Sequence, residues 1–174
     1  MGLAKSRILL IAAAEVGQRF RDALNSGRVI DVQSAEVLAT LARRGADLMV
    51  IDLGLGSQLR AYGEVLANFG AVPLLGLGPE NEAWYQLASN AHIEALADLN
   101  GADEALRTQA EILVDKGRFL RGETGLIGGS ETMQRLRERV LMIAAAPVST
   151  VLLTGESGAG KDKVAEALHR YSDR

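Results

Sequence analysis

Short apolar runs alternate with amphipathic stretches along residues 1–120 of the chain. The clearest run is Leu48-Met49-Val50-Ile51, which is continuous and apolar, as in a strand buried on both faces of a parallel sheet. Runs of this kind predict strands at 8–13, 28–32, 47–53, 72–77 and 93–96. Helical spacing of apolar residues predicts helices at 15–25, after an N-cap at Ser34, and at 59–69, 80–90 and 103–120. The alternation predicts an α/β domain with a doubly wound sheet.

The pattern restarts after the polar, glycine-flanked segment 121–125. Ser130 is expected to cap a helix that ends before Pro147. The apolar face of that helix is formed by Met133, Leu136, Val140 and Ile143. Residues 150–154 predict a strand and residues 161–170 a further helix. We therefore expect one domain over residues 1–120, a linker at 121–125, and a second, truncated domain over 126–174.

The amino-acid composition excludes several classes of function. The 174 residues are 48% hydrophobic and 24% charged, as in a globular protein, and the net charge of −3 gives no electrostatic argument for nucleic-acid or membrane binding. Cysteine is absent, which excludes disulfides, thiol catalysis and zinc–thiolate sites, and His92 and His169 lack metal-ligand spacing. The N-terminal apolar run at 8–14 is too short to span a bilayer, so we expect a cytoplasmic protein with no membrane segment.

A glycine-rich loop lies between the predicted strand 150–154 and the predicted helix 161–170. It reads Gly155-Glu156-Ser157-Gly158-Ala159-Gly160-Lys161 and fits the P-loop pattern G-x-x-x-x-G-K in its strand–loop–helix context. Glycines let backbone N–H groups converge on an anion, and the following helix directs its positive end at the same point. Lys161 adds a full charge for the β- and γ-phosphates. The loop therefore predicts ATP binding rather than a merely tight turn.

The segment 126–174 resembles the start of the AAA+ ATPase domain of sigma-54-dependent transcriptional activators. The resemblance rests on L-I-G-G-S at 126–130, on Met133 and Leu136, and on V-L-L-T-G-E-S-G-A-G-K at 151–161. It continues at Ala165, His169 and Ser172. The loop of this family usually reads GESGTGKE, so Ala159 replaces a threonine and Asp162 a glutamate. Many other P-loops have a Mg²⁺-binding Ser or Thr in place of Asp162.

The resemblance implies a set of ATP-binding residues. Ile127 and Gly128 would lie near the adenine. The phosphates would be held by Gly155, Glu156, Ser157, Gly158, Ala159, Gly160, Lys161 and Asp162. Mg²⁺ would accompany ATP in the complete ATPase domain.

The family's later elements are absent from these 174 residues: the Walker B acid pair, the GAFTGA loop, the sensor and arginine finger, and the helix-turn-helix. Phosphoryl transfer requires metal-holding and water-activating groups besides the loop. We therefore expect no ATP hydrolysis by this chain alone and interpret it as the N-terminal part of a longer activator or as a truncated relative. The resemblance implies that the missing ATPase segments contact sigma-54 RNA polymerase and that a missing C-terminal domain binds DNA.

Residues 1–120 are similar to a response-regulator receiver, a flavodoxin-like domain with strand order 2-1-3-4-5. Asp52 then matches the phospho-acceptor, which attacks a phosphoryl donor. The supporting residues differ, since 12–14 are alanines in place of an acidic pair, Gly78 replaces a Thr or Ser, and Leu99-Asn100 replaces Lys-Pro. We therefore interpret the domain as a pseudo-receiver in which Asp52 is a doubtful phosphorylation site. The helix 103–120 is the expected homodimer seam and connection to the ATPase.

Two functions stay open from the sequence. The first is a sigma-54-dependent regulator in which the pseudo-receiver controls an AAA+ module. The second is a stand-alone interaction module whose P-loop remnant is inactive. A small P-loop kinase fits poorly, because nearly all of the chain precedes the loop.

Overall fold

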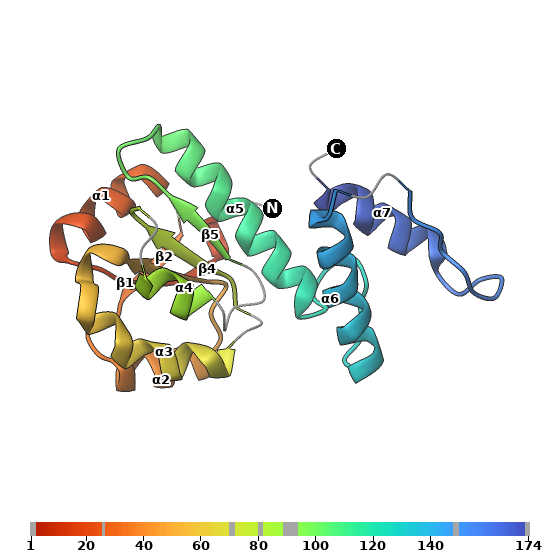
Figure 1. Cartoon of the computed structure of the whole chain (residues 1–174), viewed down its shortest axis with the longest axis horizontal. Coiled ribbons are helices and arrows are strands. Elements are labelled where there is room, and N and C mark those ends of the chain that lie inside the picture. Colours follow the sequence, from red (N-terminus) through yellow and green to blue (C-terminus); the bar gives the residue numbers. More distant parts are fainter. Residues whose placement is uncertain are drawn as a thin grey trace. The chain divides into compact units, whose positions relative to one another are not determined.

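The computed structural model describes residues 3–25, 27–69, 72–79, 82–88, 94–147 and 150–172 (Figure 1). The chain divides into two compact units, residues 1–117 and residues 118–174. Five parallel strands form the sheet of the first unit: β1 (Arg7–Ile11), β2 (Arg28–Asp31), β3 (Leu48–Asp52), β4 (Leu74–Leu77) and β5 (Glu94–Ala97). Their order is β2-β1-β3-β4-β5, which confirms the doubly wound, flavodoxin-like prediction.

Helices cover both faces of this sheet. In Figure 1, α1 (Ala14–Leu24) and α5 (Asp103–Leu120) lie on one side, and α2 (Ala35–Arg43), α3 (Arg60–Leu66) and α4 (Glu82–Ala88) lie on the other. The predicted N-cap is confirmed, since the Ser34 Oγ accepts a hydrogen bond from the Val37 N–H at 3.3 Å. The predicted helix 59–69 is α3 flanked by 3₁₀ turns at Leu53–Leu59 and Ala67–Phe69. The ends of the predicted helix 80–90, together with His92 and Ile93, lie outside the described residues.

The strands are apolar because both of their faces are covered. All five residues of β3 are buried, and Met49 and Ile51 pack with Leu38 and Trp84 in one core cluster. Trp84 also explains a glycine in β4. A Cβ on Gly76 would lie 2.8 Å from the indole Cζ3 of Trp84, so the indole occupies the space that a side chain at Gly76 would fill.

Two arginine side chains connect α5 with α1 within the first unit. The guanidinium of Arg107 donates to the Ala23 oxygen at 2.9 Å and to the Leu24 oxygen at 3.2 Å, which satisfies carbonyls at the end of α1. Arg19 forms an ion pair with Asp103 at 2.6 Å, near the start of α5. Among the described residues, no helix is long and apolar enough to cross a membrane.

The second unit is built from the last turn of α5, the segment after it, α6 (Glu131–Ala145) and α7 (Lys161–Tyr171). Ser130 caps α6 as predicted, its Oγ accepting from the Met133 N–H at 3.3 Å. The rings of Phe119 and Tyr171 lie 4.7 Å apart, tilted by 46°. The buried cluster of this unit comprises Phe119, Leu126, Val140, Ala144, Ala167 and Tyr171.

One predicted element differs from the structure. The expected strand at 150–154 has no regular secondary structure and no strand pairing among the described residues, and Leu152 is 84% exposed. A β-strand obtains its backbone hydrogen bonds from a neighbouring strand, so β-forming side chains alone do not produce one. The described strands all belong to the sheet of the first unit.

Candidate nucleotide-binding site

The glycine-rich loop adopts a backbone that requires its glycines. Gly155, Gly158 and Gly160 have φ values of +156°, +77° and +82°, all in the region that L-amino acids rarely adopt. A Cβ at Gly158 or Gly160 would meet no atom within 4 Å, so open space lies beside both residues. The glycines are therefore required by backbone conformation and not by crowding from neighbouring side chains.

Lys161 is the first residue of α7, directly after the left-handed Gly160. Its ammonium donates to the Glu156 oxygen at 2.7 Å and to the Gly155 oxygen at 3.1 Å, so its charge lies over the loop. The first N–H groups of a helix have no partner within the helix, and the helix dipole places positive potential there. Backbone, dipole and ammonium thus converge on one exposed loop, which fits the binding of a polyphosphate.

The structure gives less support for a metal site than for a phosphate site. Within the described residues, no group of three or more His, Cys, Asp or Glu side chains is placed to hold an ion. Asp162, in the first turn of α7, is exposed and is the carboxylate next to the loop lysine. An acidic residue in that turn is also favoured by the helix dipole, without any metal.

The predicted adenine contacts lie just before α6. Ile127 is 74% exposed, which leaves its side chain available to an aromatic base. Gly128 has a φ of +144°, a backbone conformation that favours glycine. A Cβ at this position would also lie only 3.2 Å from the Met133 Cγ. The carbonyl of Gly128 accepts a hydrogen bond from Arg137 at 2.8 Å.

Sequence reasoning missed Arg137. The residue is 3% exposed, and its guanidinium bonds the carbonyls of Leu120, Leu126 and Gly128. A signal was present in the pattern, because position 137 follows Met133 by four residues and precedes Val140 by three. Residues at those spacings share the apolar face of a helix, where a charged side chain is rare unless it has partners.

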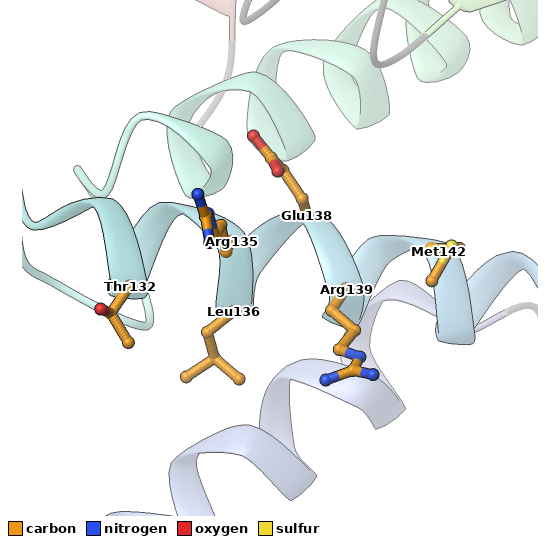
Figure 2. A pocket seen from close by; sticks show the side chains of 6 residues that line it. All are labelled: Thr132, Arg135, Leu136, Glu138, Arg139 and Met142. Carbon is orange, nitrogen blue, oxygen red and sulfur yellow. The ribbon is translucent and has the colours of Figure 1, made fainter.

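A hollow of about 560 Å³ lies along α6, and none of the residues proposed to bind the nucleotide lines it. It is lined by Thr132, Arg135, Leu136, Glu138, Arg139 and Met142 (Figure 2). Figure 2 shows Leu136 and Arg139 extending from α6 toward the neighbouring α7. No residue of the glycine-rich loop lines this hollow, so its size alone does not identify it as the nucleotide site.

Asp52, the residue matched to a phospho-acceptor, ends β3 and is 5% exposed. Its Oδ1 accepts from the Gly54 N–H at 2.8 Å and its Oδ2 from the Ala13 N–H at 3.2 Å. The carboxylate therefore joins the loop after β1 to the end of β3. This arrangement gives Asp52 a structural role that needs no phosphorylation.

Comparison with known proteins adds sequence relatives. Residues 126–174 match the family described as the sigma-54 interaction domain. The chain is 34% identical over 157 residues to the C4-dicarboxylate transport transcriptional regulatory protein DctD of Pseudomonas aeruginosa, covering 84% of this chain and 30% of that regulator. It is 49% identical over 49 residues to a signal-transduction and transcriptional-control protein of Clostridium beijerinckii, covering 28% of this chain and 8% of that protein. The chain thus spans less than a third of the length of these relatives.

A solved structure supports the fold. The structure of NtrX from Brucella abortus in complex with ATP matches 97% of this chain, and the chain covers 41% of it, with a TM-score of 0.55. Sequence identity is 20%, so the likeness concerns the fold.

Proposed function

This chain is a relative of the sigma-54-dependent transcriptional regulators, and on that premise we propose that it binds ATP through its glycine-rich loop. The same proposal divides the chain into a pseudo-receiver over residues 1–120, a linker at 121–125 and a nucleotide-binding portion over 126–174. In the complete regulator, ATP bound at this portion would be used to act on sigma-54 RNA polymerase.

The observation that carries the proposal is the conformation of the loop. Gly155, Gly158 and Gly160 are held at positive φ directly before a helix whose first residue is Lys161. Positive-φ glycines next to a helix N-terminus make a concave anion site, and a lysine at its rim neutralises phosphate charge. A turn that served packing alone would gain nothing from the lysine.

Each part of the proposed site has a role. The backbone N–H groups of the loop bind the phosphates, and Lys161 is directed at the β- and γ-phosphates when it leaves the Gly155 and Glu156 carbonyls. Ile127 and Gly128 contact the adenine. Asp162 lies where it would interact with Mg²⁺ that accompanies the nucleotide. When bound, ATP and Mg²⁺ supply the phosphoryl-transfer chemistry, whose remaining catalytic groups belong to the family's later segments.

The pseudo-receiver is proposed to regulate through contacts and not through phosphorylation of Asp52. The carboxylate already accepts two backbone hydrogen bonds, and Ala12, Ala13 and Gly78 stand where a phosphorylated receiver needs metal-binding and hydroxyl side chains. Regulation would then pass along α5, with a homodimer formed through residues 103–120. DNA contacts would come from a further domain of the complete regulator.

Titration with a fluorescent ATP analogue tests nucleotide binding, with and without Mg²⁺. We expect saturable binding by the unmodified chain and its loss in Lys161→Ala. Lys163→Ala is the matched control, since Lys163 lies on the same helix but is paired with Glu166 at 2.8 Å. Equal binding by all three proteins would place the nucleotide elsewhere and refute the assignment of the loop.

A stand-alone interaction module remains the second candidate, and one observation favours it. Among the described residues, residues 150–154 have no strand partner, whereas a P-loop ordinarily follows a strand of a sheet. If the unmodified chain fails to bind the analogue under both conditions, the loop is inactive in this chain. The first unit would then be the functional part.

A further inference from the structure

Arg137 holds together three segments of the second unit. Its Nε donates to the Leu120 carbonyl at 2.9 Å, and its Nη1 donates to the carbonyls of Leu126 at 2.9 Å and Gly128 at 2.8 Å. Leu120 is the last residue of α5, and Gly128 belongs to the segment proposed to contact the adenine. A single guanidinium therefore joins the end of α5 to the base-contacting segment.

The end of α5 is itself shaped around this side chain. Gly122, at φ +75°, donates from its N–H to the Phe119 carbonyl at 2.9 Å, and the Glu123 N–H donates to the Arg118 carbonyl at 2.9 Å. These two bonds form a Schellman motif, which ends the helix through a left-handed glycine. A Cβ on Gly122 would lie 2.9 Å from the Nη1 of Arg137. The glycine thus also makes room for the guanidinium.

The partners of Arg137 are unusual for a buried arginine. Buried charges are normally paired with opposite charges, yet the partners that the described residues offer to Arg137 are three neutral carbonyls. One of them ends a helix, where the dipole makes a positive charge favourable. The planar fork of a guanidinium reaches several acceptors in fixed directions, which a lysine ammonium on a flexible stem does not.

We propose that Arg137 is a positioning residue that sets the base-contacting segment 126–128 in a geometry dictated by the end of α5. The inference rests on the proposed nucleotide site and adds a regulatory connection to it. Any change that alters the last turn of α5 moves the Leu120 carbonyl, and the guanidinium transmits that change to the Gly128 carbonyl. Among the described residues, the hydrogen bonds of Arg137 go to Leu120, Leu126 and Gly128 and not to the loop 155–161. The connection therefore affects the binding of the base and not the binding of the phosphates.

Calorimetric titration of the whole chain distinguishes an effect on binding of the base from an effect on binding of the phosphates. ATP requires the base-contacting segment and the loop, whereas inorganic tripolyphosphate requires only the loop. For Arg137→Met we expect ATP affinity to fall about tenfold while tripolyphosphate affinity changes by less than about twofold. Arg137→Lys retains the charge and one donor group and should give an intermediate, ATP-selective loss. Lys161→Ala should lower the affinity for both ATP and tripolyphosphate.

Arg139→Met is the matched control, because Arg139 is exposed on the same helix and undergoes the same chemical change. It should leave both affinities unchanged. Equal losses for ATP and tripolyphosphate in the Arg137 variants, or no loss, would overturn the positioning role while leaving the nucleotide site in place. Absence of ATP binding by the unmodified chain would instead refute the proposed function, and the inference with it.

Amide exchange of α6 and α7 shows whether Arg137→Met keeps the second unit folded. If those amides lose protection, Arg137→Lys decides the question in its place. That variant keeps the positive charge and one donor group, and we expect an intermediate, ATP-selective loss. An ATP affinity equal to that of the unmodified chain would contradict the proposal.

Discussion

At the scale of single residues, backbone carbonyls and N–H groups decide what the notable side chains do. Arg137 is buried because it satisfies carbonyls left open at the end of α5 and before α6, and removal of a buried donor of this kind leaves several acceptors unsatisfied. Asp52 is buried for the reciprocal reason, since it accepts from two N–H groups. The sequence indicated Asp52 as a functional candidate and gave no role to Arg137, and the structure gives each a definite set of hydrogen bonds.

Gly122→Ala tests the left-handed end of α5. Alanine at φ +75° is strained, and its Cβ would meet the Arg137 guanidinium. We expect the second unit to lose about 1–3 kcal/mol of stability. The measurement is amide exchange of α6 and α7. Gly129→Ala is the control, because its Cβ would meet nothing within 4 Å, and its φ is not in the left-handed region. Similar effects of the two substitutions would contradict this account.

Asp52→Ala tests the structural role of the buried carboxylate. Two N–H groups, of Ala13 and Gly54, would lose their acceptor, so we expect the first unit to be destabilised by about 1–3 kcal/mol. Denaturant unfolding measures the loss. Asp31→Ala is the matched control at the end of the neighbouring β2, where the carboxylate forms an exposed pair with Arg21 worth less than about 1 kcal/mol. An Asp52 effect no larger than the Asp31 effect would refute the role.

Incubation with acetyl phosphate and Mg²⁺ tests the pseudo-receiver interpretation. Both oxygens of Asp52 are occupied by hydrogen bonds, and no acidic pair follows β1 in the sequence. We expect the intact mass of the chain to stay unchanged. The appearance of one phosphoryl group that is absent from Asp52→Ala would show that Asp52 is a working phospho-acceptor.

At the scale of elements, sequence predicted what local pattern determines. The five strands of the first unit, the capping of α2 by Ser34 and of α6 by Ser130, and the full extent of α5 follow from periodicity and cap chemistry. The strand expected at 150–154 was not found, because strand formation depends on a partner that local sequence does not reveal. The bonds of Arg137 escaped prediction for the same reason, since they join residues up to seventeen positions apart.

Hydrogen exchange tests the state of residues 150–154. Without a neighbouring strand, their amides are open to water, and we expect them to exchange far faster than the amides of β1 and β3. Mass spectrometry of peptides covering both regions measures the difference. Protection of 150–154 comparable to that of β3 would show that these residues form a paired strand.

At the scale of the whole molecule, the proposed function joins a receiver-like sheet domain to a phosphate-binding loop. The linker at 121–125 stays a prediction; the second compact unit includes Arg118 and the residues after it, and Phe119 packs against Tyr171. The sequence pattern predicts that the first domain extends to the end of this helix, and the last turn of the helix contributes Phe119 to the core of the second unit. Helix periodicity locates the element and does not reveal which core it joins.

The most direct test of the central claim is a residue-resolved map of ATP binding by NMR or hydrogen exchange. If the loop binds ATP, added ATP changes the signals of Ile127, Gly128 and the loop 155–162 and leaves the strands of the first unit unaffected. Lys161→Ala should abolish these changes. Changes confined to the hollow along α6, at residues such as Arg135, Glu138 and Arg139, would place the nucleotide there and refute binding by the loop.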